Sequence, residues 1–288
     1  MISNQLREAL AAPRVREFAF GNEDFEALRK LVKELTGINL SDQKRELVYG
    51  RLARRLRALH LRTFAEYRDL LASDGGREIA ELCNAITTNL TSFFRESHHF
   101  DYLREQVLQP LAANRPGQRR VRIWSAGCST GEEAYSLAMT VVESFPDLRT
   151  WDVKILATDL DSDVLEKAQR GVYTADRVRG IGPQRLSRFF VEKRAREGLC
   201  YEVSRELASL ITFKQLNLMH PLPMKGPLDA IFCRNVVIYF DKDTQRELFS
   251  RIAQLQRPGN LLFLGHSESL FKVSESYTPI GKTVYRRA

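Results

Sequence analysis

Apolar residues over about the first 115 positions recur at the three- and four-residue spacing of amphipathic helices. The first such segment begins at Asn22, a predicted N-cap, and ends before Gly37, where a helix is expected to stop. Its apolar stripe consists of Phe25, Leu28, Leu31, Val32 and Leu35. We therefore expect a helix over 22–36.

The same spacing continues in later segments. Ser41 and Thr63 are predicted N-caps of the second and third helices. The second helix is expected to bury Leu47, Leu52, Leu56 and Leu59. The expected helices after the first are 41–60, 63–73, 77–88 and 97–113.

The pattern then changes to short apolar runs separated by helix-like segments. The runs are predicted strands at 121–126, 153–160, 210–217, 228–236, 259–267 and 283–288. Alternating strands and helices predict an open α/β sheet with helices on both faces. The last run is expected to be an edge strand. Between about 186 and 210, the run GLCYEVSREL indicates a small β structure inserted between strands of the sheet.

Composition narrows the class of protein. The chain has 288 residues, of which 43% are hydrophobic, and this is typical of a globular protein with a sizeable core. No apolar run reaches the roughly 18 residues of a membrane span, and the first residues lack the apolar stretch of a signal peptide, so a cytoplasmic location is expected. The four cysteines form no CxxC pair, and we expect reduced thiols rather than disulfides or a zinc site.

The net charge of +8 favours an acidic partner, which on charge alone is nucleic acid, an anionic membrane or an acidic protein. Part of this charge crowds the second predicted helix, at Arg51, Arg54, Arg55 and Arg57. Helical spacing places Arg51, Arg54 and Arg55 on one face. This face is either a docking surface or a solvated one, and RNA would suit it as well as a protein.

A glycine-containing turn joins the first predicted strand to a helix that begins near Glu132. Gly127 and Gly131 allow a tight turn and a close approach of a ligand to the backbone. The pattern Gly127-x-Ser129-x-Gly131 matches the nucleophile elbow of α/β-hydrolases, but that elbow normally follows several strands of its sheet. A dinucleotide fingerprint fails, because Ser129 and Glu132 occupy two of its glycine positions. The nucleoside loop of a methyltransferase and a purely structural turn remain open.

Asp159 ends the second predicted strand. A carboxylate at this position can accept both hydroxyl groups of a ribose, as the acidic residue of dinucleotide folds does. Alternatively, Asp161 or Ser162 is merely the N-cap of the next helix, and the two roles can coexist. A ribose site without phosphate-binding glycines indicates a nucleoside such as S-adenosylmethionine.

Five segments resemble the chemotaxis receptor methyltransferase (CheR) family in their order along nearly the whole chain. They are ITTNLTSFFRE, IWSAGCSTGEEAYSLAM, ATDLD, LDAIFCRNVVIYFD and LLFLGHSESL. The resemblance implies an α/β protein with a small all-helical N-terminal domain over 1–88, which docks the substrate. It also implies a C-terminal Rossmann-like S-adenosylmethionine methyltransferase domain over 89–288, with a small antiparallel β-subdomain inserted at about 186–210.

The same resemblance assigns contacts to the cofactor S-adenosylmethionine and its product S-adenosylhomocysteine. The expected contacts are Asn89, Thr91 and Arg95 at the methionine end or sulfonium, Gly127 in the loop, Glu132 near the amino acid moiety, Asp159 on the ribose, Asn217 and Leu218 beside the adenine, and Arg234 and Asn235 completing the pocket.

The implied activity is methyl transfer to glutamate side chains of chemoreceptors, which gives glutamyl methyl esters. A glutamate is ionised at neutral pH and needs no general base. Arg95 is expected to orient the incoming carboxylate and Tyr239 to align it, although core packing is an alternative for Tyr239. No metal is expected, because the adjacent His98 and His99 would diverge by about 100° on a helix.

The expected partner is the cytoplasmic helical region of chemoreceptors, docked by the arginines of the second helix. In some family members the β-subdomain also tethers a C-terminal receptor peptide, and GLCYEVSREL offers a strand edge for one. No nucleic acid partner is expected, and the family implies a monomer. Two other classes stay open on the residues alone: an RNA methyltransferase and a non-catalytic sensor of the cofactor.

Overall fold

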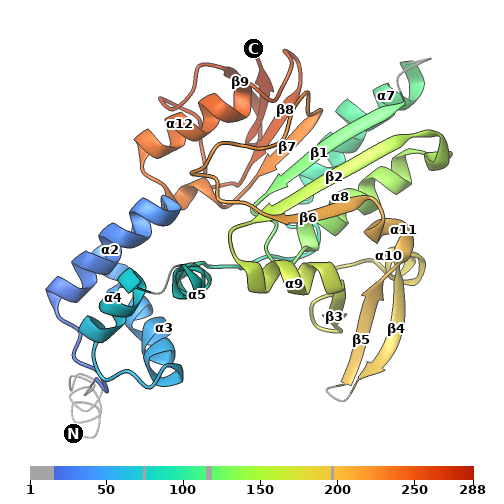
Figure 1. The fold of residues 1–288 in the computed structure, drawn as a ribbon. Coiled ribbons are helices and arrows are strands. Elements are labelled where there is room, and N and C mark those ends of the chain that lie inside the picture. The colour runs from blue at the N-terminus through green and yellow to red at the C-terminus, as the bar shows by residue number, and fades with distance from the viewer. Residues whose placement is uncertain (1–15, 74–75, 115–118, 196–197) are drawn as a thin grey trace, which may run out of the picture. The chain divides into compact units, whose positions relative to one another are not determined.

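The computed structural model describes residues 16–73, 76–114, 119–195 and 198–288 (Figure 1). Their contacts divide the chain into two compact units. The helical unit comprises residues up to 34 together with 40–86, and the sheet unit comprises 35–39 and 87–288. The predicted division placed a single boundary after residue 88, and its first 15 residues lie outside the described part of the chain.

Helices build the helical unit in the predicted order. They are α2 (Asn22–Thr36), the 3-10 turn η1 (Asp42–Lys44), α3 (Arg45–Ala58), α4 (Phe64–Ser73) and α5 (Arg77–Ile86). From the predicted stripe of α2, Phe25, Leu28 and Val32 are fully buried. On α3, Leu52 and Leu56 are buried as expected.

Of the three predicted N-caps, only Thr63 is confirmed. Asn22 is already part of α2, and Ser41 makes no side-chain cap bond. The Thr63 hydroxyl accepts the Glu66 N–H at 3.1 Å, and the Glu66 carboxylate reaches back to the N–H of Arg62 at 2.7 Å. The Thr63 side chain therefore caps α4, and the prediction for Thr63 is confirmed.

Leu47 was predicted on the buried side of α3 and is instead 43% exposed, whereas its neighbour Val48 is fully buried. The prediction assumed one regular helix from Ser41. The 3-10 turn η1 has fewer residues per turn, and therefore it shifts the phase of the residues that follow it.

A buried carboxylate joins α3, α4 and α5. Arg55 of α3 donates twice to Glu78 of α5, at 3.0 and 2.6 Å, and Glu78 is only 4% exposed. The hydroxyl of Tyr67 on α4 donates to the same carboxylate at 3.0 Å. Arg51 donates to the carbonyls of Ala85 and Ile86, at the end of α5 where helix carbonyls lack intrahelical partners.

The sheet unit alternates strands and helices. Its strands are β1 (Arg120–Ala126), β2 (Asp152–Asp159), β3 (Val172–Thr174), β4 (Phe190–Ala195), β5 (Gly198–Val203), β6 (Ile211–Gln215), β7 (Ala230–Cys233), β8 (Leu261–Leu264), β9 (Tyr277–Gly281) and β10 (Val284–Arg287). Its helices and turns are α6 (His98–Leu103), the π-helical η2 (Arg104–Leu108), α7 (Gln109–Asn114), α8 (Glu132–Ser144), η3 (Leu148–Thr150), α9 (Ser162–Arg170), α10 (Pro183–Phe189), α11 (Arg205–Ala208), η4 (Val237–Tyr239) and α12 (Lys242–Ala253).

Within the described residues, seven strands form a large sheet in the order β6-β2-β1-β7-β8-β10-β9 (Figure 1). The first five run parallel to one another, and β10 is antiparallel to both of its neighbours. Successive side chains of a strand point to opposite faces. Accordingly, Ile123 of β1 packs in one core with Leu137 of α8, and Trp124 packs in the other core with Phe249 of α12. Helices therefore cover both faces, as predicted.

The C-terminal strand was wrongly predicted to lie at an edge. β10 lies between β8 and β9, and β9 is the edge strand. β9 escaped prediction because Pro279 interrupts its sequence, and proline demotes a strand pattern. An edge strand tolerates a proline, since one of its sides needs no ladder hydrogen bonds.

The small sheet has the order β3-β5-β4 and is antiparallel throughout. It projects away from the large sheet as a narrow ribbon (Figure 1). The predicted insert at 186–210 covers β4 and β5 but leaves out β3. β5, which carries most of GLCYEVSREL, has no open edge because it is the central strand, so the predicted strand edge was wrongly placed there. The outer edges belong to β3 and β4.

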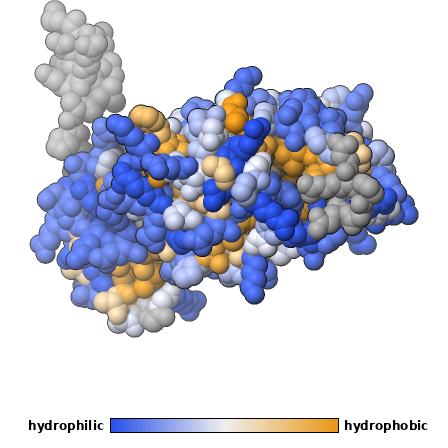
Figure 2. Space-filling view, turned by 90° about the horizontal axis from the view of Figure 1, so that it is seen from above, coloured by the Kyte–Doolittle hydropathy of each residue, from blue (hydrophilic) through white to orange (hydrophobic). Residues whose placement is uncertain are grey.

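None of the helices in the described part of the chain is both long and apolar enough to span a membrane. In the face seen in Figure 2, hydrophobic surface occurs as separate patches among hydrophilic side chains. Scattered apolar residues of this kind are normal on a folded protein.

We predict that Glu78→Gln lowers the free energy of unfolding by about 2–4 kcal/mol, because it leaves the half-buried Arg55 guanidinium without its closest charge partner. Urea unfolding followed by circular dichroism measures the loss. The matched control is Glu81→Gln. Glu81 also contacts Arg55, at 2.9 Å, but it is 42% exposed, so a loss below about 1 kcal/mol is expected. Equal losses for the two variants would contradict the role of burial.

Candidate functional site

The predicted cofactor residues gather at one edge of the large sheet. Four adjacent parallel strands end there, in the order β6, β2, β1 and β7. The chain leaves β1 toward β2 and β6 on one side, and later crosses to β7 and β8 on the other. β1 and β7 therefore flank a topological switch point, where open α/β sheets bind ligands. The residues at these strand ends are Asn217 and Leu218 after β6, Asp159 in β2, Gly127 after β1, and Arg234 and Asn235 after β7.

The turn after β1 depends on its glycines. Gly127 and Gly131 have φ angles of 90° and 96°, which side-chain-bearing residues rarely adopt. A Cβ atom at Gly127 would lie 2.3 Å from the side chain of Val236, so the two loops approach each other too closely for any other residue. The tight turn and the start of α8 at Glu132 are both confirmed.

Ser129 has a structural role in this turn. Its hydroxyl donates to the carbonyl of Asn89 at 2.9 Å, and its N–H donates to Asp159 at 2.7 Å. A hydrolase nucleophile would need its hydroxyl directed at a general base. This geometry therefore opposes the nucleophile-elbow interpretation.

Asp159 is a buried carboxylate with acceptor capacity to spare. It accepts the N–H groups of Ser129 at 2.7 Å and Asp161 at 3.0 Å, and it is 9% exposed. Burial raises the pKa of Asp159, and the backbone N–H groups of Asp161, Ser129 and Leu160 oppose that shift. An ionised carboxylate has about four lone-pair positions, so acceptor capacity remains for a ribose hydroxyl group.

Asp161 caps α9, as the alternative interpretation held. One of its oxygens accepts the N–H groups of Asp163 at 2.9 Å and Val164 at 3.2 Å. The other accepts the Thr87 hydroxyl at 2.7 Å and the Asn89 amide at 2.6 Å. Asp161 thus anchors the segment that continues into Thr91 and Arg95, which was not predicted.

Glu132 and Glu133, the two acidic residues at the start of α8, bind different partners. Glu132 is fully buried, accepts the Thr130 hydroxyl at 2.6 Å and pairs with Arg177. Glu133 accepts the hydroxyl of Ser125 at 2.7 Å and pairs with Arg234 at 3.0 Å. Sequence reasoning gave a role only to Glu132, because nothing in the sequence links Glu133 to an arginine a hundred positions away.

Arg234 connects the strand end to the predicted catalytic loop. Its side chain is 1% exposed. Besides Glu133, it donates to the carbonyl of Arg95 at 2.5 Å and lies 3.4 Å from the carboxylate of Glu96. Arg95 itself donates to the carbonyl of Leu90 at 2.9 Å. The loop that carries Arg95 is therefore held at both its backbone and its side chain.

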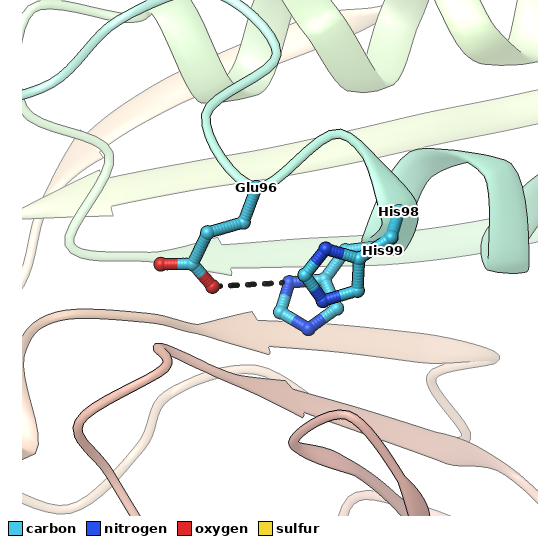
Figure 3. Close-up of side chains that lie close together, drawn as sticks. All are labelled: Glu96, His98 and His99. Atoms are coloured by element: carbon cyan, nitrogen blue, oxygen red, sulfur yellow. Dashed lines mark ion pairs between the residues drawn. The ribbon is translucent and has the colours of Figure 1, made fainter.

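Glu96, His98 and His99 lie close together at the start of α6 (Figure 3), with one ligand atom from each within 4.8 Å of the others. The histidine ring centroids are 4.2 Å apart, so the expected divergence of this pair was wrong. Side-chain rotation brings adjacent residues together at a helix start. Arg234 already lies beside the Glu96 oxygen that faces His99, and its charge opposes a second cation there. We interpret Glu96 as a charge partner of Arg234.

The pKa values in this cluster follow from burial and charge. His99 Nε2 lies 2.9 Å from the Lys282 carbonyl, which can only accept, so this nitrogen carries the proton. Burial and the charge of Arg234 lower the pKa of His99 to about 4. For Glu96, burial raises the pKa, but the bond from His266 and the charge of Arg234 outweigh it and hold the pKa at about 2.

Asn217 and Tyr239 both contact the short segment 35–39 within the sheet unit. The Asn217 amide donates to the carbonyl of Leu35 at 2.6 Å, and its oxygen accepts the N–H of Met219 at 2.9 Å. The Asn39 N–H donates to the carbonyl of Tyr239 at 2.7 Å. Tyr239 is half-buried in η4.

Glu268, in the loop after β8, was not among the predicted residues although its segment was. It is 5% exposed and accepts backbone N–H groups from the segment that links Arg234 to Tyr239. The sequence signal was a glutamate directly after the predicted strand 259–267, but its partners are main-chain groups, which no side-chain pattern reveals.

The four arginines predicted to dock a substrate divide into two pairs within the helical unit. Arg51 and Arg55 are half-buried and make the bonds to α5 described above. Arg54 and Arg57 are exposed, with Arg54 donating to the Gly50 carbonyl at 3.4 Å and Arg57 pairing with Glu17 at 3.0 Å. Only the second pair is exposed to solvent.

Comparisons of the sequence with family models and with known proteins find members of the same family. The chain matches two family models: CheR methyltransferase, all-alpha domain, over residues 23–87, and CheR methyltransferase, SAM binding domain, over residues 89–286. Chemotaxis protein methyltransferase 2 of Pseudomonas aeruginosa is 45% identical over 276 residues, which cover 95% of this chain and 96% of that protein. The chemotaxis protein methyltransferase of Escherichia coli is 42% identical over 281 residues, covering 96% and 95%.

We predict a loss of stability between pH 7 and pH 5 that depends on His99. The unfolded chain binds a proton near the ordinary pKa of 6.5, whereas folded His99 binds one only near 4. Its contribution is therefore complete above about pH 6.5 and is lost as the pH falls toward 4. His99→Gln keeps an amide donor for Lys282 but does not titrate. Urea titrations should show that it loses about 2 kcal/mol less than the wild type between pH 7 and pH 5.

The matched control is His220→Gln, at an exposed histidine, which should keep the pH dependence of the wild type. A wild-type pH dependence in His99→Gln would show that burial of this imidazole is not its cause.

Proposed function

The chain belongs to the CheR family of chemotaxis protein methyltransferases, and we propose that it methylates glutamate side chains on a helical chemoreceptor partner. Family membership confirms the resemblance, the fold class and the enzyme class predicted from the sequence. The protein is an S-adenosylmethionine-dependent methyltransferase of chemotaxis. The observation that best supports the acceptor is the Arg95 side chain, anchored beside the switch point where the cofactor residues gather.

The residues at this edge fit S-adenosylmethionine. Asp159 retains acceptor positions for a ribose, and Gly127 leaves the loop after β1 without a side chain. The Nε atom of Arg234 is buried without a hydrogen-bond partner among the described residues, so it remains available to a ligand. The proposed cofactor contacts are Asn89, Thr91, Arg95, Gly127, Glu132, Asp159, Asn217, Leu218, Arg234 and Asn235. The amide of Asn89 and the carboxylate of Glu132 would share their present protein bonds with the ligand.

Bound S-adenosylmethionine supplies an electrophilic methyl group on a sulfonium. The acceptor glutamate is already ionised at neutral pH, so the protein needs no general base. We assign to Arg95 the orientation of the carboxylate through a charge-assisted hydrogen bond. Tyr239 aligns the same group from η4. The protein contributes mainly by holding the reactants in line and excluding water.

Exposed apolar side chains beside the site support a macromolecular acceptor. Leu90 follows Asn89 and is 76% exposed, and Ile238 precedes Tyr239 and is 46% exposed. Apolar side chains exposed next to polar site residues commonly mark a protein contact. An amphipathic receptor helix would cover them while it presents a glutamate.

The acceptor is tested with tritiated S-adenosylmethionine and membranes that contain chemoreceptors. We expect label on the receptor that base releases as methanol, because a glutamyl ester hydrolyses. Base-stable label that requires RNA would favour the RNA methyltransferase, and cofactor binding without any methylated acceptor would favour the sensor.

Two variants separate binding from turnover in this experiment. Asp159→Ala should weaken S-adenosylhomocysteine binding at least about tenfold by calorimetry, which corresponds to the loss of about 1.4 kcal/mol. Arg95→Ala should still bind S-adenosylhomocysteine and should lose most of its turnover. Unchanged turnover in Arg95→Ala would remove it from the mechanism.

We also propose two contacts with the receptor: docking through Arg54 and Arg57, and binding of a receptor-tail peptide along β4. We further propose that the protein is a monomer and is located in the cytoplasm. β4 is the longer outer edge of the small sheet, and Val191 on it is 54% exposed. The double variant Arg54→Ala, Arg57→Ala should raise the KM for the receptor severalfold without changing the affinity for S-adenosylhomocysteine.

Calorimetry should detect binding of the tail peptide to the wild type and not to Val191→Pro. No heat of binding with either protein would contradict the tether.

A further inference from the structure

Glu268 holds a stretch of backbone on which two proposed site residues depend. Its carboxylate is buried, and among the described residues its hydrogen-bond partners are all backbone N–H groups. Oε1 accepts three of these groups and Oε2 accepts two. The donors are Val236 (2.8 Å), Val237 (2.8 Å) and Ile238 (3.2 Å) to Oε1, and Asn235 (2.8 Å) and Gly265 (2.6 Å) to Oε2.

A carboxylate suits this position because the first N–H groups of a helical turn have no partner within the turn. η4 begins at Val237, so the four donors from 235 to 238 converge at its start. Convergent backbone N–H groups form a concave site for an anion. Two charged oxygens can satisfy all of them, whereas a neutral amide has only one accepting oxygen.

The loops after β7 and β8 are also packed against each other at this point. A Cβ atom at Gly265 would lie 2.8 Å from the backbone nitrogen of Asn235 and 2.4 Å from its amide nitrogen. Asn235 itself has a φ of 59°, a left-handed conformation that asparagine adopts more readily than most residues. Asn235 therefore has an uncommon conformation, in which Glu268 binds its N–H and the missing side chain of Gly265 leaves room for it.

We propose that Glu268 is a positioning residue for methyl transfer, which sets Asn235 for the cofactor and Tyr239 for the acceptor through the backbone between them. It acts on both through main-chain bonds and touches neither substrate. This role rests on the proposed function, because Asn235 and Tyr239 derive their importance from it.

Glu268→Gln is the first test, because the amide keeps the size of the side chain and one accepting oxygen. The oxygen can retain the three bonds to Val236, Val237 and Ile238, but the NH₂ group then faces the N–H groups of Asn235 and Gly265. We expect S-adenosylhomocysteine to bind about tenfold more weakly by calorimetry. Hydrogen exchange of the amides at 235 and 265 should accelerate about tenfold, while exchange in the central strands β1 and β2 is unchanged.

The control is Glu275→Gln, which removes the same charge from an exposed carboxylate in the next part of the loop and should behave as the wild type. Gly265→Ala is the second variant. It leaves Glu268 intact but forces a Cβ atom against Asn235, and it should weaken S-adenosylhomocysteine binding to a similar extent. It decides the question if Glu268→Gln fails to fold.

The outcomes separate this inference from the proposed function. A folded wild type that does not bind S-adenosylhomocysteine would overturn both. A wild type that binds, with Glu268→Gln and Gly265→Ala equal to it in affinity and in local exchange, would overturn the positioning role alone. Faster exchange throughout the sheet unit would also overturn it, because that result indicates only a loss of global stability.

Discussion

The position of β1 between two parallel neighbours is the constraint on which the rest of the molecule depends. Parallel strands end at the same edge, so the segments that leave β2, β1 and β7 must meet there however far apart they lie in the sequence. Parallel pairing also requires that both faces be covered, and β7 and β8 are buried along their whole length as a result. The site thus follows from the order of the strands, and side chains then refine it.

Carboxylates provide most of that refinement. Asp159, Asp161, Glu133 and Glu268 each accept at least two hydrogen bonds, and most of the donors are backbone N–H groups of the loops at the strand ends. The buried charge of Arg234 balances part of this negative charge and links the Arg95 loop to α8. A net positive protein therefore builds its candidate site around acidic side chains, and most of its basic side chains lie elsewhere.

The sequence was sufficient for features that are encoded locally. Continuous apolar runs predicted the central strands, and the position of Asp159 at the end of one of them placed it at the edge of the sheet. Other features depend on partners that the local sequence does not specify. β9 was not predicted because it contains Pro279, and β10 was therefore predicted as the edge strand. The sequence around Arg55 did not predict its ion pair with Glu78, because that pair forms only when α3 packs on α5. Glu268 was missed for the same reason, since four of its five donors are main-chain groups some thirty residues earlier.

The short segment Leu35–Asn39 has a consequence for how such proteins diversify. It groups with the sheet unit although the residues on both sides of it belong to the helical unit, so the chain passes between the units at three points rather than one. A recombination event with a single crossover near residue 88 would separate Gly37 from Met219, whose sulfur would lie 2.3 Å from a Cβ atom at position 37. The helical unit therefore cannot be replaced by that of a relative without disturbing contacts of the sheet unit. Functional hybrids between relatives should arise most readily when 35–39 is inherited together with the sheet unit.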